Sequence, residues 1–285
     1  MTIEALPVVV IGAGPVGLAA AARLLERGLA PLVLEQGPSV GSAVSAWGHV
    51  RLFSPWRFNI DAAARGLLEE TGWQAPAPEQ VPTGHDLIRD YLAPLADHPA
   101  LASSIVLGAR VTAVTRRGLD KLGSSDRAAA PLVVLWHDAE GREHRTEARA
   151  VLDASGTWGS PNPMGVDGLP VTGEKQAAHI AYGIPDVLGR ERAGYAGQRI
   201  LVVGGGHSAI NVALDLLRLQ EEAPATEVIW ALRRERIDRL LGGGLNDQLP
   251  ERGALGLAAT RAIAAGRIEV LAPFAAERID TAAGR

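Results

Sequence analysis

The sequence lacks cysteine altogether: none occurs among its 285 residues. Without a thiol, the chain can form neither a disulfide bond nor a thiolate metal site, and it has no redox-active cysteine pair and no cysteine nucleophile. The sequence also lacks any apolar run of the roughly 20 residues that cross a bilayer, and no positively charged leader with an apolar region precedes Val8. We therefore expect a cytoplasmic protein that has no membrane partner.

A concentrated positive charge is missing as well. The formal net charge is −4, and basic and acidic residues are interspersed along the chain. A phosphate backbone needs a basic stripe, so we expect no nucleic-acid partner. The histidines at positions 49, 85, 98, 137 and 144 show no metal-ligand spacing, so no metal site is expected. With 47% hydrophobic residues, the chain can bury the core of one large domain or of two ordinary ones.

Residues 8–35 follow the pattern of a mononucleotide-binding unit. An apolar, β-branched run over Val8–Ile11 meets a glycine turn, and apolar residues then recur at helical spacing until Gly28 stops the helix. A second strand over Pro31–Glu35 completes a β-α-β unit of about 30 residues. The turn reads Gly12-Ala-Gly14-Pro-Val-Gly17, which fits the dinucleotide-binding pattern G-x-G-x-x-G.

Each residue of this turn has an expected role. Gly12 allows a sharp turn, Gly14 allows the backbone to approach a pyrophosphate, and Gly17 allows the helix to pack closely on the strand. The helix that starts at Pro15 points its free amides and its positive end at the phosphates. Glu35, at the end of the second strand, can accept hydrogen bonds from both hydroxyls of a ribose, and it would repel a 2′-phosphate.

A second unit of the same kind begins at Arg199. Its turn, Gly204-Gly-Gly206-His207-Ser208-Ala209, has alanine in the third position, which the pattern allows. We expect a strand to Val203, a helix over Ser208–Glu221, a strand over Glu227–Leu232, a helix over Arg252–Ala265 and a strand over Arg267–Leu271. Gly242–Gly244, with Asn246 and Asp247, forms either a lid over a nicotinamide or a simple connecting loop.

The second unit differs from the first in its charge. No acidic residue ends its second strand, and Arg233 and Arg234 stand there instead. Guanidinium groups form bidentate contacts with a 2′-phosphate, so this site is expected to prefer NADPH to NADH. The alternative is that both arginines are a solvated strand end. Ser208 can donate to a phosphate, and it fits equally well as an ordinary residue of the first helical turn.

The sequence between the two units predicts further elements. We expect helices over Asp61–Thr71 and, after an N-cap at Thr83, over Gly84–Ala96. Gly118–Ala129 is typical of a surface loop, and Ser155–Gly197, dense in Gly and Pro, is the expected domain boundary. Four strands are expected here: Ile105–Leu107, Val111–Arg116, Pro131–Trp136 and Ala148–Asp153. They would form one strand and a small meander, and Ala148–Asp153 would close the meander.

The order of these motifs resembles that of flavoproteins with two dinucleotide-binding domains, and within them the flavin-containing monooxygenase-like group. The resemblance rests on GAGPVG, Glu35, the strand Ala150–Gly156 and GGGHSA. It implies an α/β fold with two Rossmann-like domains: a glutathione-reductase-like FAD domain with a β-meander over residues 1–160, and an NAD(P)H domain over residues 161–285. The disulfide reductases that share this architecture need a cysteine pair beside the flavin. This chain has no cysteine, so that chemistry is excluded.

The resemblance also implies cofactor contacts. Ala154-Ser155-Gly156 matches a family segment Ala-Thr-Gly that returns to the flavin. Trp47, Arg51 and Trp56 lie where the family wraps the isoalloxazine with a loop after the second strand, and Arg51 is expected near the flavin pyrophosphate. Gln36, next to Glu35, is a further expected cofactor contact, and Val111 lies on a strand that contacts adenine through its backbone. The alternative for Trp47 and Trp56 is an aromatic core under a long loop.

Two departures from the family pattern stand out. The monooxygenase signature F-x-G-x-x-x-H is matched only in part by Gly173 to His179, with Val171 in place of Phe. This departure puts Baeyer–Villiger activity in doubt. His179 is either a nucleotide contact or a linker residue. The family continues past the position of Arg285 with a strand that returns to the first domain. We expect this C-terminal return to be missing, in a truncated chain or a minimal form.

The expected function is that of an FAD-dependent oxidoreductase reduced by NADPH. The resemblance implies a monooxygenase that uses molecular oxygen and a flavin hydroperoxide to oxygenate a nitrogen or sulfur centre of a small molecule. One alternative is an NADPH-dependent flavin reductase or oxidase without oxygen insertion, and another is a non-catalytic dinucleotide-binding module. Because the cofactors perform the chemistry, no side chain is named as acid or base. Neither the acceptor substrate nor the oligomeric state follows from the sequence.

Overall fold

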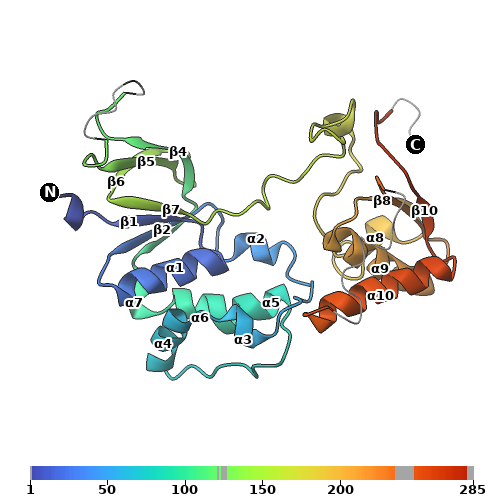
Figure 1. The fold of residues 1–285 in the computed structure, drawn as a ribbon, viewed down its shortest axis with the longest axis horizontal. Coiled ribbons are helices and arrows are strands. Elements are labelled where there is room, and N and C mark those ends of the chain that lie inside the picture. The colour runs from blue at the N-terminus through green and yellow to red at the C-terminus, as the bar shows by residue number, and fades with distance from the viewer. Residues whose placement is uncertain (1, 121, 123–126, 235–246, 281–285) are drawn as a thin grey trace. The chain divides into compact units, whose positions relative to one another are not determined.

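The computed structural model describes residues 2–120, 122, 127–234 and 247–280. The chain divides into two compact units, residues 1–159 and residues 160–285 (Figure 1). Each unit contains its own parallel sheet and its own buried core. The α/β class with parallel sheets, which the sequence predicts, is confirmed.

The first unit is built on a four-stranded parallel sheet in the order β3-β2-β1-β7. The strands are β1 (Val8–Ile11), β2 (Pro31–Glu35), β3 (Ile105–Leu107) and β7 (Ala150–Asp153). The strand β1 pairs with β2 on one side and with β7 on the other, so that Val9 lies opposite Leu32 and Val151. Because all four strands are parallel, their carboxyl ends meet at one edge of the sheet. Ligands of open α/β sheets bind at that edge.

Helix α1 (Pro15–Glu26) connects β1 to β2 and packs through Leu18, Ala21 and Ala22, none of which is more than 1% exposed. The other helices of this unit are short: α2 (Ser42–Ser45), α3 (Trp56–Asn59), α4 (Ala62–Glu70), α5 (Gly84–Leu87), α6 (Ala93–Ala96) and α7 (Pro99–Ala102), besides the 3-10 turn Ile3–Ala5. A π-helical segment over Ile88–Leu92 joins α5 to α6, so the helix predicted over Gly84–Ala96 is present with a widened middle turn. The predicted N-cap at Thr83 is confirmed.

An antiparallel meander in the order β4-β5-β6 completes the first unit. Its strands are β4 (Arg110–Arg116), β5 (Leu132–His137) and β6 (Glu143–Ala148). The prediction that a strand over Ala148–Asp153 closes the meander is wrong, because β6 closes it and β7 pairs with β1 instead. β6 was missed because its sequence, Glu-His-Arg-Thr-Glu-Ala, has no apolar alternation; pairing with the apolar β5 holds it in the sheet.

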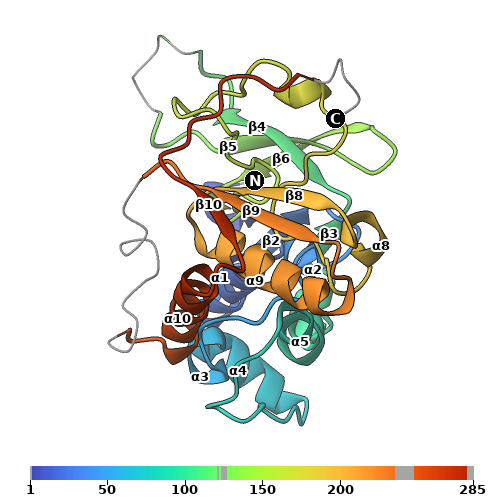
Figure 2. The same cartoon turned by 90° about the vertical axis from the view of Figure 1, so that its right-hand side faces the viewer.

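The second unit contains a three-stranded parallel sheet in the order β10-β9-β8. Its elements are the 3-10 turn η3 (Glu174–Gln176), α8 (Arg192–Tyr195), β8 (Arg199–Val203), α9 (His207–Glu222), β9 (Glu227–Ala231), α10 (Pro250–Ala264) and β10 (Glu269–Leu271). Helices α9 and α10 lie on the same side of the sheet (Figure 2) and share one core with Trp230 of β9. The strands and the two long helices predicted for this unit are confirmed, with ends that differ by one or two residues.

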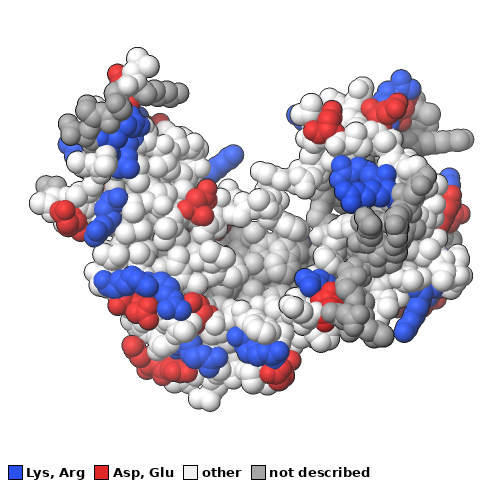
Figure 3. Space-filling model, in the orientation of Figure 1, with Lys and Arg blue, Asp and Glu red and all other residues white. Residues whose placement is uncertain are grey.

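Charges of both signs are mixed on the face of the molecule drawn in Figure 3. Several basic side chains on this face lie beside acidic ones. Exposed ion pairs of the first unit include those of Arg23 with Glu26 and of Arg65 with Glu69. Within the ranges that the structure describes, no helix combines the length and the apolar character needed to cross a bilayer.

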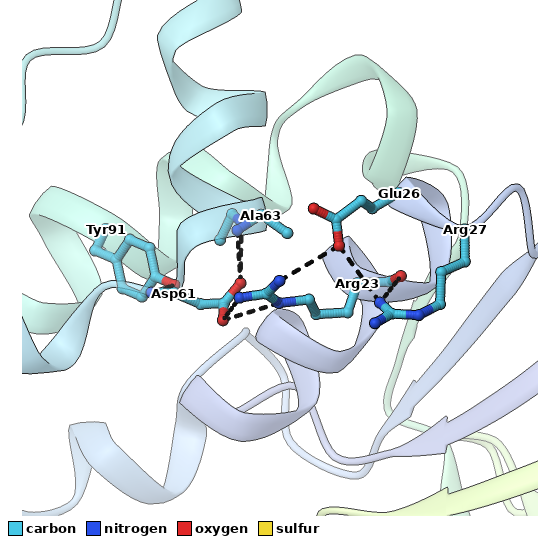
Figure 4. Close-up of polar contacts among 7 residues, drawn as sticks. Arg23, Glu26, Arg27, Asp61, Ala63 and Tyr91 are labelled. Carbon is cyan, nitrogen blue, oxygen red and sulfur yellow. Dashed lines mark hydrogen bonds and ion pairs between the residues drawn. The ribbon is translucent and has the colours of Figure 1, made fainter.

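Asp61 joins several elements of the first unit (Figure 4). Its Oδ1 accepts hydrogen bonds from the amides of Ala63 and Ala64, at 2.8 and 3.3 Å, and so caps α4. Its Oδ2 accepts from Nε and Nη2 of Arg23 on α1, at 3.1 and 2.9 Å. Its own amide donates to the hydroxyl of Tyr91 at 3.2 Å. One carboxylate therefore ties α4 to the first helix of the dinucleotide-binding pattern.

Replacement of Asp61 with alanine removes the cap and the ion pair together. An N-cap contributes about 1 kcal/mol, and a partly exposed ion pair contributes at most about 1 kcal/mol. We expect Asp61→Ala to lower the free energy of unfolding by about 1–2 kcal/mol. Asp61→Asn keeps an oxygen for the cap and should lower it by less. Urea-induced unfolding measures both losses, and equal losses would contradict a contribution of the cap.

The same contacts produce a pH dependence. Partial burial of Asp61 favours its neutral form, but the hydrogen bonds from Arg23, Ala63 and Ala64 outweigh this effect and hold the pKa of the carboxyl below its ordinary 3.8. A depressed pKa stabilises the fold above the unfolded pKa, and this contribution is lost as the pH falls through the folded pKa. The stability difference between the wild type and Asp61→Asn should therefore be full above about pH 5 and shrink below pH 3.8. Unfolding curves over this range test the sign: a difference that grows with acidity would be inconsistent with it.

Candidate functional site

The first glycine turn lies at the carboxyl edge of the parallel sheet, between β1 and α1. Gly12 has a φ of +97°, a conformation that glycine adopts without strain. A Cβ atom at Gly12 would lie 2.7 Å from the carbonyl oxygen of Ala154, so the chain that leaves β7 contacts the turn directly. The amide of Ala154 donates to the carbonyl of Ile11 at 2.9 Å. The structure thus brings together the glycine turn and Ala154-Ser155-Gly156, two motifs predicted to contact one dinucleotide.

The other two glycines of this turn differ in their surroundings. A Cβ at Gly17 would lie 1.9 Å from the carbonyl oxygen of Gly12, so only glycine lets α1 pack this closely on the turn. Gly14 is the N-cap residue of α1, and a Cβ there would meet no atom within 4 Å. No side chain caps the helix that starts at Pro15. Gly14 therefore fronts open space at the positive end of a helix, where a phosphate can approach.

Both oxygens of Glu35 are held by backbone amides. Oε2 accepts from the amide of Ala13 at 2.7 Å, and Oε1 accepts from the amide of Gly37 at 2.7 Å. The residue is 8% exposed. A carboxylate oxygen can accept two hydrogen bonds, so each oxygen retains capacity for a ligand hydroxyl. The two amides fix the carboxylate beside the turn, and its charge opposes a 2′-phosphate.

The remaining residues predicted for this site lie at different depths. Gln36 is exposed, and Val111 is half-buried in β4. Arg51 is exposed, and its Nη1 donates to a backbone carbonyl, that of residue 81, at 2.8 Å. Trp47 is half-buried against the core of this unit, whereas Trp56 is 1% exposed and belongs to that core. Trp56 therefore fits the alternative prediction, that of an aromatic core residue.

Sequence reasoning missed residues that shape this site. Asp153 accepts from the hydroxyl and the amide of Ser155, at 2.6 and 3.1 Å, and the bond from the hydroxyl lowers the pKa of the Asp153 carboxyl. Gly41 has a φ of +66°, and its amide donates to the carbonyl of Ala13 at 2.9 Å, which ties the segment after β2 to the glycine turn. The Gly-Pro-Ser-Val-Gly stretch that ends at Gly41 was a visible turn signal.

The second glycine turn lies at the carboxyl edge of β8. Gly204 has a φ of +122°, and its carbonyl accepts a hydrogen bond from Nε1 of Trp230 at 2.7 Å. Gly206 is the N-cap residue of α9, and a Cβ at Gly204 or Gly206 would meet no atom within 4 Å. Ala209 packs against the core, so this helix accommodates a Cβ where α1 does not. Open space again fronts the positive end of a helix.

A cavity of about 2160 Å³ lies in the second unit, and the turn Gly204–Gly206 and Arg233 both line it. Arg233 and Arg234 are exposed, and neither guanidinium has a hydrogen bond or ion pair with the described part of the chain. Ser208 is exposed in the first turn of α9, and His207 is half-buried. An unpaired guanidinium that shares a cavity with a glycine turn suits a 2′-phosphate.

Buried Glu174 organises the wall of this cavity. Its carboxylate accepts from the amides of Met164 and Val171, at 3.0 and 2.8 Å, and from the hydroxyl of Tyr182. Burial favours the neutral form, but these hydrogen bonds outweigh it, so the pKa of Glu174 lies below its ordinary value. Tyr182 and His179 both line the cavity, so the end of the echoed monooxygenase signature shares this cavity with the second turn.

The residues Gly242–Gly244 and Asn246, predicted as a lid or a loop, lie outside the described residues. Asp247, which follows them, has a side chain that is 2% exposed. It accepts from Arg252 of α10 at 2.7 Å and from the amide of Leu249 at 3.0 Å. These contacts hold the beginning of α10.

Comparison with known proteins gives a family match over most of the chain. The profile of the family described as pyridine nucleotide-disulphide oxidoreductase matches residues 6–253, which include both glycine turns. The chain is 27% identical over 221 residues to dimethylaniline monooxygenase (N-oxide-forming) 4 of Oryctolagus cuniculus, covering 74% of this chain and 36% of that protein. It is 37% identical over 137 residues to a ferredoxin–NADP reductase of Gluconacetobacter diazotrophicus, covering 47% of this chain and 32% of that protein.

A solved structure supports the fold. The bacillithiol disulfide reductase Bdr of Bacillus cereus matches 96% of this chain and 70% of that chain, with a TM-score of 0.71 and 20% sequence identity. The chain spans about a third of the length of the two curated relatives.

The contrast between Gly17 and Gly14 gives a test of the first turn. Gly17→Ala places a methyl group against backbone and should lower the free energy of unfolding by about 3 kcal/mol or more. The added methyl group of Gly14→Ala meets no atom, so this substitution should change the free energy of unfolding by no more than about 0.5 kcal/mol. It should nevertheless weaken dinucleotide binding. Urea-induced unfolding and titration with FAD measure the two effects. Equal destabilisation by both substitutions would contradict the geometry described here.

Proposed function

Because the chain belongs to the pyridine nucleotide-disulphide oxidoreductase family, we propose that it is an FAD-dependent oxidoreductase that NADPH reduces. The observation that carries the proposal is the contrast between its two glycine turns. Each turn fronts open space at the start of a helix, but Glu35 stands beside the first and Arg233 shares a cavity with the second. A carboxylate suits the free ribose of FAD, and a guanidinium suits the 2′-phosphate of NADPH.

In this proposal, the first unit, residues 1–159, binds FAD. The amide of Gly14 and the turn of Gly12 and Gly17 would hold the pyrophosphate, and Glu35 would hold the ribose. Pro15, which has no amide hydrogen, would start the helix whose positive end faces the pyrophosphate. The fit is supported by the open space at Gly14 and by the remaining hydrogen-bonding capacity of the carboxylate. The further proposed contacts are Gln36, Trp47, Arg51, Val111, Ala154, Ser155 and Gly156.

The second unit, residues 160–285, would bind NADPH. Gly204, Gly206 and the first helical turn, His207-Ser208-Ala209, would face the pyrophosphate. Arg233 and Arg234 would contact the 2′-phosphate, and the absence of a partner for either guanidinium among the described residues supports this assignment. The fit therefore rests on charge that the described chain leaves uncompensated.

The proposed reaction is the oxygenation of a nitrogen or sulfur centre in a small molecule. One oxygen atom of molecular oxygen enters the product, the other leaves as water, and NADPH supplies the two electrons. FAD, when bound, supplies the redox chemistry; the residues of this chain bind and orient the cofactors. The relative named as N-oxide-forming supports this reaction class. Disulfide reduction through a cysteine pair of this chain is excluded, since the chain has none.

A second candidate is an NADPH-dependent flavin reductase or oxidase that inserts no oxygen. The match to a ferredoxin–NADP reductase favours it, because that match has 37% identity over 137 residues. Such an enzyme would produce hydrogen peroxide in step with the NADPH consumed. The monooxygenase would consume NADPH with little peroxide once an acceptor substrate is present.

The test of the proposed function is the visible spectrum of the purified protein, followed by anaerobic addition of NADPH or NADH. We expect bound flavin that NADPH bleaches faster than NADH does, because only NADPH carries the 2′-phosphate. Protein that remains colourless after incubation with FAD would overturn the proposal. Bleaching that is equally fast with both nucleotides would overturn the role of the arginines alone.

Arg233→Ala should weaken the interaction with NADPH specifically. A hydrogen bond to a charged group contributes about 1.5–3 kcal/mol, so the Kd for NADPH should rise roughly tenfold to a hundredfold. The Kd for NADH should change by less than about twofold, since NADH has no phosphate at that position. Anaerobic flavin reduction at varied nucleotide concentration measures both constants. A parallel loss for the two nucleotides would indicate damage to the site rather than a lost phosphate contact.

A further inference from the structure

The segment that follows β10 lies against the carboxyl end of β9. The amide of Leu232 donates to the carbonyl of Leu271 at 2.9 Å, and the amide of Phe274 donates to the carbonyl of Leu232 at 2.8 Å. These two hydrogen bonds continue the parallel pairing of β9 with β10 beyond the ends of both strands. They hold Phe274 beside the residue that directly precedes Arg233.

The side chain of Phe274 belongs to the cavity of the second unit and not to its core. Phe274 is half-buried and lines the same cavity as Arg233 and the turn Gly204–Gly206. Val270 and Ala272, which precede it, pack against the core of this unit, but Phe274 is not among the described residues that do so. Ligand pockets are lined by aromatic side chains of this kind, because a ring outside the core offers its face to a ligand.

The strand order decides which part of a dinucleotide reaches Phe274. Along the sheet β10-β9-β8, the glycine turn follows β8, Arg233 follows β9 and Phe274 follows β10. Neighbouring strands lie about 4.8 Å apart, so one nucleotide can extend from the turn to Phe274. In the proposed function, the turn faces the pyrophosphate and Arg233 contacts the 2′-phosphate of the adenosine. The base on that ribose then continues in the same direction, toward Phe274, whereas the nicotinamide leaves the pyrophosphate in the other direction.

We infer that Phe274 binds the adenine of NADPH by stacking its ring on the face of the base. The inference rests on the proposed function and extends it to a residue outside both glycine motifs. Stacking of a base on an aromatic side chain contributes affinity without any hydrogen bond. Because NADPH and NADH carry the same base, Phe274 contributes equally to the binding of both, and Arg233 alone distinguishes them at this end of the site.

The test compares two substitutions of Phe274 in the full chain. Phe274→Leu keeps an apolar side chain and removes the aromatic face, whereas Phe274→Tyr keeps the face. Phe58→Leu is the matched control for the loss of a phenylalanine ring, because Phe58 is exposed and lies in the first unit. Isothermal titration calorimetry gives the Kd for NADP⁺, NAD⁺ and 2′,5′-ADP, none of which transfers a hydride to the flavin. The melting temperature of the nucleotide-free protein is measured alongside.

The expected pattern separates a contact with the base from a contact with the phosphate and from a structural role. Phe274→Leu should raise the Kd for all three nucleotides about fivefold or more, because all three contain adenine. Arg233→Ala should raise the Kd for NADP⁺ and 2′,5′-ADP only. Phe274→Tyr should keep each Kd within about threefold of the wild type. The melting temperature of Phe274→Leu should stay within about 2 °C of the wild type, because Phe274 lies outside the core.

Three results would overturn the inference while the wild type binds these nucleotides: an unchanged Kd in Phe274→Leu, a loss for NADP⁺ that 2′,5′-ADP does not share, or an equal loss in Phe274→Tyr. A loss of the same size in Phe58→Leu, or a melting temperature of Phe274→Leu well below that of the wild type, would overturn it as well. If the wild type binds none of the three nucleotides, the proposed function fails together with this inference. Binding that Arg233→Ala weakens and Phe274→Leu does not would refute the inference alone.

Discussion

The first unit depends on the close approach of three backbone segments at the Gly12 peptide. A Cβ at Gly12 would collide with the carbonyl of Ala154, and a Cβ at Gly17 would collide with the carbonyl of Gly12. The start of α1 and the end of β7 therefore meet at one peptide group. This contact brings the positive end of a helix, the Ser155 segment and the carboxylate of Glu35 to one edge of the sheet. The contacts proposed for the pyrophosphate and the ribose of FAD are arranged around that edge.

The second unit also has a glycine turn at the start of a helix, but the charged side chains associated with it have the opposite sign. Its turn is held by a hydrogen bond from Trp230 to Gly204, and its helix accommodates the Cβ of Ala209. Where the first unit has a carboxylate fixed by two amides, the second has guanidinium groups without a partner in the described chain. The same fold therefore presents a hydrogen-bond acceptor beside one turn and a cation in the cavity of the other. That difference in charge, on one architecture, is the basis for proposing two different nucleotides.

Most elements of both units were predictable because their signals are local. The helix from Pro15 and the helix over residues 207–222 show apolar periodicity and glycine starts within a few residues. The strands β6 and β7 were misassigned, because the charged sequence of β6 shows no alternation. Its place in the meander depends on β5, and the place of β7 depends on β1, more than 130 residues earlier in the chain. Pairing partners of this kind override local preference.

The sequence by itself determined the two glycine turns, the acid at the end of one strand, the arginines at the end of the other, and the absence of thiol chemistry. These features follow from residue types at short spacing, where sterics and charge act directly. Only the tertiary structure decided that Ala154 contacts Gly12 and that the amides of Ala13 and Gly37 hold Glu35. The physical reason is that hydrogen bonding and close packing depend on which distant backbone segments meet, and residue type alone does not contain that information.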